Sequence, residues 1–93
     1  MKAKETCVTR FSPGDAWVTG RPFEEQPGYR RQVRWWMMMR RRGLLSWIGI
    51  PVGHPQQILV RWHGISLSEA RRQAANAPFV RKGVLREATP VAI

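Results

Sequence analysis

Hydrophobic and polar residues alternate along several short stretches of the chain, and this period of two predicts β-strands. Residues 7–11 have strand-type side chains, residues 12–15 form a strong turn signal, and residues 16–19 are expected to return as a second strand. Residues 44–50 and 58–63 are two further predicted strands, separated by a loop that contains prolines and glycine.

The stretch over residues 29–42 is the most informative one. Counted at a period of two, Tyr29, Arg31, Val33, Trp35, Met37 and Met39 share one face, and Arg30, Gln32, Arg34, Trp36, Met38 and Arg40 share the other. We therefore predict a strand over residues 29–40, with an apolar face on the core and a basic face in solvent. A helix is the alternative, because Val33, Trp36, Met37 and Met39 also form a stripe. Arg41, Arg42 and Gly43 are expected to form a short loop.

A helix is predicted near the end of the chain. Ser66 and Glu69 have the spacing of a capping box, and Leu67, Ala70, Ala74 and Ala77 lie on one face of the helix that would follow. Pro78 is expected to end it, and residues 79–88 are predicted as a last strand around Gly83. The resulting fold class is α+β: a single domain over residues 1–93 with a small, mainly antiparallel sheet of five to six strands and one helix on one face.

Charge is distributed very unevenly. The formal net charge is +10, and 13 of the 16 basic residues are arginine. No acidic residue occurs between Glu25 and Glu69. Arginine binds phosphate bidentately and stacks on bases, so this composition is typical of a protein whose partner is a polyanion.

The residues predicted to bind nucleic acid or a partner lie mainly on the basic face of residues 29–42. They are Arg30, Arg34, Trp36, Arg40, Arg41 and Arg42, with Arg71 and Arg72 as part of a second patch. Trp36 would offer a stacking surface among the arginines. Two alternatives stay open: an acidic protein surface would also accept this face, and both Trp35 and Trp36 could be core residues beside a solvated row of arginines.

The sequence has few residues in the arrangements that catalysis or metal binding requires. Cys7 is the only cysteine, and with His54 and His63 it falls short of a structural zinc site. Carboxylates are scattered, so we expect no enzyme, no cofactor and no small-molecule substrate; a small basic ribonuclease that uses His63 is the enzyme alternative. The N-terminus lacks the apolar segment of a signal peptide, and no apolar run approaches the length of a membrane span, so we expect a cytoplasmic protein with no membrane partner.

Residues 65–75, followed by Phe79 and the stretch 83–87, resemble the helix-then-strand ending of some small phage proteins that inhibit CRISPR–Cas complexes. The resemblance implies a non-enzymatic inhibitor that docks on a bacterial ribonucleoprotein complex or a nuclease. It assigns a function to no particular residue. Together with the charge pattern, it predicts a non-catalytic basic protein that binds nucleic acid or a nucleic-acid-containing complex.

Overall fold

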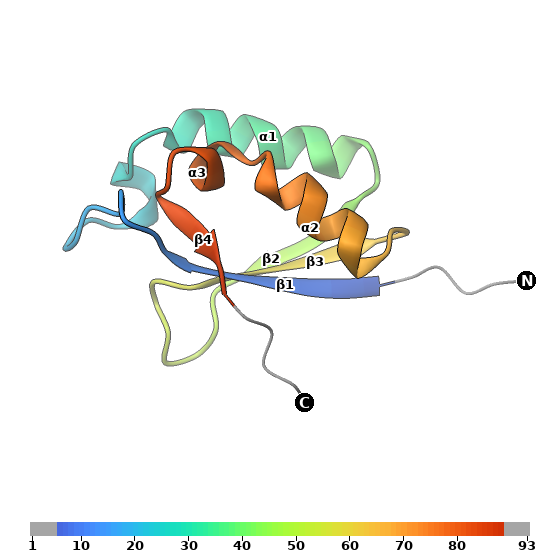
Figure 1. The fold of residues 1–93 in the computed structure, drawn as a ribbon, viewed down its shortest axis with the longest axis horizontal. Coiled ribbons are helices and arrows are strands. Elements are labelled where there is room, and N and C mark those ends of the chain that lie inside the picture. Colours follow the sequence, from blue (N-terminus) through green and yellow to red (C-terminus); the bar gives the residue numbers. More distant parts are fainter. Residues whose placement is uncertain (1–5, 89–93) are drawn as a thin grey trace, which may run out of the picture.

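Within residues 6–88, which the computed structural model describes, four antiparallel strands form one sheet and the helices pack on one of its faces (Figure 1). The strands are β1 (Thr6–Pro13), β2 (Leu45–Gly49), β3 (Ile58–His63) and β4 (Leu85–Glu87), in the spatial order β2-β3-β1-β4. The helices are α1 (Tyr29–Arg41), α2 (Leu67–Ala75) and α3 (Pro78–Arg81), and a short 3-10 turn, η1, spans Phe23–Glu25. The α+β class is therefore confirmed, but the predicted five to six strands and one helix are not.

The core lies between the sheet and the helices. Alternate residues of β3, namely Ile58, Val60 and Trp62, are buried on the helix side. The indole Nε1 of Trp62 donates a hydrogen bond of 2.9 Å to Oγ1 of Thr9, so the ring is buried without an unpaired polar group. Ala70 and Ala74 of α2 are buried too, and their small side chains allow this helix to lie close to the sheet.

The strand predicted over residues 29–40 is wrong, because Tyr29–Arg41 forms the helix α1. The residues that turn inward, Tyr29, Gln32, Trp36 and Met39, are spaced at three and four positions, which is the helical period. The helix places both tryptophans on the core side, whereas a strand would leave Trp36 in solvent. Arginine, methionine and glutamine are also good helix formers, so local propensity supports the helix.

Gly43 ends α1 with a Schellman motif. Its φ is +75°, its N–H donates to the carbonyl of Arg40 at 3.0 Å, and the N–H of Leu44 donates to the carbonyl of Met39 at 3.1 Å. From the sequence, Gly43 is expected in a loop between two strands. A left-handed glycine serves both geometries, so this residue alone did not distinguish a hairpin from a helix end.

Two other predicted strands are also wrong. Residues 16–19 form no strand, since the backbone N–H and C=O of Val18 bond the buried side chain of Gln26 at 2.8 and 3.0 Å instead of a neighbouring strand. The predicted last strand over residues 79–88 begins as helix α3, which Pro78 starts rather than blocks, because proline fits the first helical position. Within this predicted strand, Leu85–Glu87 is the part that pairs with β1, as strand β4.

The predicted helix near the C-terminal end is confirmed as α2. The Oγ of Ser66 accepts a hydrogen bond of 3.2 Å from the backbone N–H of Glu69, as its capping position requires. No helix within residues 6–88 combines the length and apolar character that crossing a membrane requires. The prediction made on the N-terminal residues 1–5 lies outside the described residues.

Candidate nucleic-acid interface

One side of α1 is covered with arginine. Successive helical residues are separated by 100°, so four arginines and two methionines share the side away from the sheet. This arginine face consists of Arg30, Arg31, Arg34, Met37, Met38 and Arg41. All six side chains are exposed, including Met37 at 51% and Met38 at 46%.

Within residues 6–88, the arginine face has no acidic side chain in an ion pair with it. α1 contains no acidic residue, and the ion pairs formed within residues 6–88 involve none of its arginines. Two features of this arrangement oppose helix stability: Arg30 and Arg31 lie at the positive end of the helix dipole, and Arg30 and Arg34 are like charges one turn apart. A helix selected only for stability would carry acidic residues in its first turn. The face is thus a concentrated positive surface that is open to an external anion.

The other predicted arginines of this region are exposed but lie beside the arginine face. Arg40 comes one turn after Trp36, on the flank of α1, and Arg42 is the residue that caps the helix at its C-terminal end. The negative end of the helix dipole stabilises their positive charges. They extend the positive field at one end of α1 without joining the row of Arg30, Arg34 and Arg41.

Trp36 does not belong to this surface. Its ring packs edge-on against Phe79 of α3, with ring centroids 6.3 Å apart, and Trp35 packs against Trp62 with centroids 6.1 Å apart. Both tryptophans are partly buried against the core. The prediction that Trp36 lies on the same face as the exposed arginines is therefore wrong, because the helix turns its ring toward the sheet. Its role in binding a base stays a prediction.

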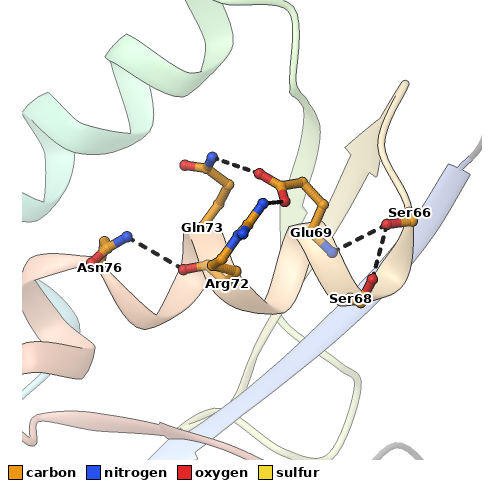
Figure 2. A network of polar contacts seen from close by, with 6 residues as sticks. All are labelled: Ser66, Ser68, Glu69, Arg72, Gln73 and Asn76. Atoms are coloured by element: carbon orange, nitrogen blue, oxygen red, sulfur yellow. Dashed lines mark hydrogen bonds and ion pairs between the residues drawn. The ribbon is translucent and has the colours of Figure 1, made fainter.

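Arg71 and Arg72, which were predicted as part of a second patch, have positive charges that carboxylates neutralise. Nε of Arg71 lies 2.9 Å from Oε1 of Glu87, and Arg72 forms an ion pair with Glu69 on the same helix. Figure 2 shows that Glu69 also accepts a hydrogen bond from Gln73, at 3.1 Å. The hydrogen bonds from Gln73 and Arg72 lower the pKa of the Glu69 carboxyl below its ordinary value, and the charge of Arg72 adds to this effect. These two arginines already have anionic partners, whereas the ion pairs of residues 6–88 include no arginine of α1.

A second basic surface, which the sequence did not predict, lies on the side of the sheet that no helix of residues 6–88 covers (Figure 1). Trp47 of β2 and Arg61 of β3 are opposite each other in the strand register and are both exposed. Strict alternation would place Trp47 on the same side as the buried Leu45. A β-bulge between these two residues shifts the register and turns Trp47 outward.

His63 lies half-buried at the end of β3, and its role in a ribonuclease reaction stays a prediction. Within residues 6–88, no three or more histidine, cysteine, aspartate or glutamate side chains gather closely enough to hold a metal ion. Comparisons with protein-family models, curated proteins and solved structures gave no match to this chain.

Proposed function

We propose that the chain is a non-catalytic, cytoplasmic protein that binds nucleic acid, alone or within a ribonucleoprotein, through the arginine face of α1. The observation that carries this proposal is the row Arg30, Arg34 and Arg41, exposed on one side of a helix whose arginines have no acidic partner among the described residues. A guanidinium group without an internal partner is available to bind phosphate bidentately.

The spacing of the row suits a phosphate backbone. Arg30 and Arg34 are separated by about 6 Å along the helix axis, and Arg41 follows about 10 Å further on. Long arginine side chains can adjust these spacings by several ångströms, so the row can contact successive or alternate phosphates. Contacts of this kind bind without reading sequence and weaken strongly with salt.

A CRISPR–Cas ribonucleoprotein is the most concrete form of this partner. The resemblance of residues 65–75, Phe79 and the stretch 83–87 to small phage inhibitors supports that choice, since such a complex presents both guide RNA and a channel for DNA. In this form of the proposal, the arginine face occupies phosphate-binding positions or covers the guide RNA. The same variants that lose nucleic-acid binding should then lose inhibition of target binding by the purified complex.

The test compares two triple variants that remove the same charge. The variant Arg30→Gln/Arg34→Gln/Arg41→Gln removes three arginines that form no ion pair within residues 6–88. Its matched control, Arg21→Gln/Arg71→Gln/Arg72→Gln, removes three arginines that pair with Glu25, Glu87 and Glu69. Fluorescence anisotropy of a labelled 20-nucleotide duplex, at low salt, reports the affinity of each.

We expect the arginine-face variant to lose affinity by on the order of 1000-fold, since each of the three lost contacts to a charged phosphate is worth about a factor of ten. The control should lose less than about threefold, because its arginines are engaged in ion pairs. Equal losses in the two variants would mean that net charge alone determines binding. No binding by the unaltered chain would refute the proposal.

An acidic protein is the second candidate partner, and exposed methionine favours it. Met37 and Met38 lie between the arginines, and methionine adapts to apolar contacts on a partner protein. Phosphate binding needs no such contacts. The double variant Met37→Gln/Met38→Gln should therefore keep its affinity for the duplex and bind an acidic protein partner more weakly. Loss of duplex affinity in this variant would contradict the assignment of the two methionines to protein contacts.

A further inference from the structure

The outer face of the sheet carries an organised set of side chains. It comprises Val8, Arg10, Trp47, Leu59, Arg61 and His63, and we call it the open sheet face. The register places Arg61 between Trp47 on one neighbouring strand and Val8 on the other. Side chains opposite each other on one face of a sheet lie about 5 Å apart at Cβ, so Trp47 and Arg61 are immediate neighbours.

Local backbone structure positions Trp47. The bulge before it turns the side chain outward, and Oγ of Ser46 donates a hydrogen bond of 3.2 Å to the carbonyl of Arg61 at this point. The indole then extends over Gly49, where an added Cβ would come within 2.2 Å of two of its ring carbons. Glycine at this position leaves the space that the ring occupies. The ring remains 50% exposed, so it is held in place and accessible to a ligand.

The charge of the open sheet face is positive. Arg10 and Arg61 come from β1 and β3, and Arg86 of β4 pairs with Ser12 at the adjoining edge of β1. The strands contain a single acidic residue within 6–88, Glu87, whose carboxylate binds Arg71 of α2 on the helix side. An anionic ligand would therefore meet no opposing carboxylate from the strands.

A shallow hollow of about 600 Å³ lies on this face, and its lining combines apolar and polar groups: Val8, Ser46, Trp47, Leu59, Arg61 and His63. Its volume falls within the range of small-ligand sites. An aromatic ring beside arginines is the combination that binds a flat base joined to a phosphate. A base inside a duplex has both its faces stacked, so only an unpaired base can stack on Trp47.

We propose that the open sheet face is a second binding site, specific for single-stranded nucleic acid. Trp47 stacks on one unpaired base, and Arg61 and Arg10 bind the phosphates that flank it. The site lies on the side of the sheet opposite α1, so it is separate from the arginine face and either site can exist without the other (Figure 1).

The experiment measures the affinity of the full chain for three labelled oligonucleotides. These are a twelve-nucleotide oligothymidylate, an abasic strand of the same length, and a duplex. The variants are Trp47→Ala, the conservative Trp47→Phe, and Arg61→Gln. Circular dichroism verifies that each variant is folded, and sedimentation reports its oligomeric state.

Trp47→Ala should weaken oligothymidylate binding about tenfold, the effect of losing one stacked base, and should leave abasic and duplex binding unchanged. Trp47→Phe should retain most of the affinity, because phenylalanine also stacks. Arg61→Gln should weaken binding to both single strands. If Trp47→Ala does not fold, Trp47→Phe and Arg61→Gln still decide the question: unchanged oligothymidylate binding by Arg61→Gln would overturn the proposal.

Three other results would also overturn it. A folded Trp47→Ala variant with unaltered oligothymidylate affinity would remove the stacking role. An equal loss on the abasic strand would show that the bases are not read. A dimer that Trp47→Ala dissociates would assign this face to a second copy of the chain. Retained duplex binding in each case would leave the arginine-face proposal intact, so the failure of one proposal is distinguishable from the failure of the other.

Discussion

Gln32 joins two helices through one buried hydrogen bond. Its side chain is 2% exposed, and its Oε1 accepts a bond of 2.8 Å from the backbone N–H of Phe79 at the start of α3. We expect Gln32→Leu to destabilise the protein by about 1–3 kcal/mol, because the N–H of Phe79 would stay buried without a partner. Urea unfolding measures this cost. Gln56→Leu, in an exposed loop, is the control and should change stability by less than about 0.5 kcal/mol. Equal stabilities of the two variants would show that the bond contributes nothing.

Glu69 should make the protein less stable as the pH becomes acidic. The folded state lowers the pKa of this carboxyl through hydrogen bonds from Gln73 and Arg72, so the ionised form is favoured on folding. The resulting stabilisation is fully present above the pKa of the unfolded chain and disappears as the pH falls through the folded pKa. Glu69→Gln should therefore be less stable than the unaltered chain at pH 7 and equally stable near pH 2. Thermal melts across this range test the sign; a constant difference at all pH values would contradict it.

At the scale of elements, the sequence predicts the segments whose hydrophobic pattern agrees with a single period. Residues 58–63 have Ile58, Val60 and Trp62 at alternate positions and form β3, and the capped segment from Ser66 forms α2. Residues 29–41 contain both periods. The helical period depends on Gln32, a buried polar residue that a count of hydrophobic residues would place at the surface. Met37 and Met38 obscure this period further, because they are apolar residues that the fold leaves exposed.

The candidate surfaces were predictable to different degrees. Arginine at the surface is expected in a strand or a helix, so the exposure of Arg30, Arg34 and Arg41 does not depend on which of the two forms. The direction of an aromatic ring does depend on it, which is why Trp36 was misplaced. Trp47 required knowledge of a bulge, and a bulge is a property of strand pairing that alternation within one strand cannot reveal.

The electrostatics of α1 predict opposite effects of one substitution at its two ends. Arg30→Glu places a negative charge at the positive end of the helix dipole and one turn before Arg34, so we expect a gain of about 0.3–1 kcal/mol in stability. Arg41→Glu places the same charge at the negative end and should cost a similar amount. Both variants should lose affinity for the duplex. Thermal unfolding and anisotropy measure the two quantities, and a loss of stability in Arg30→Glu would contradict the view that α1 gives up stability for binding.

At the scale of the whole molecule, the sheet separates two basic surfaces of different chemistry. The arginine face presents charge with exposed methionines, and the open sheet face presents charge with Trp47. The core lies between them and draws on both layers, with Met39 from α1 and Trp62 from β3. Removing surface arginines from α1 should therefore affect the opposite face only through long-range charge, which salt screens beyond about 10 Å.

Because the two surfaces are separate, the salt dependence of duplex binding can show whether the duplex contacts the arginine row of α1. Each phosphate contact adds about 0.9 to the slope of log affinity against log salt concentration, because it releases a condensed counterion. The variant Arg30→Gln/Arg34→Gln/Arg41→Gln should reduce this slope by about two to three. The control that removes the ion-paired Arg21, Arg71 and Arg72 should leave the slope nearly unchanged, although it removes the same charge. Anisotropy titrations between 50 and 300 mM salt measure both slopes. Parallel lines for the two variants would mean that duplex DNA meets a diffuse positive field, and the row along α1 would then have no special role in binding.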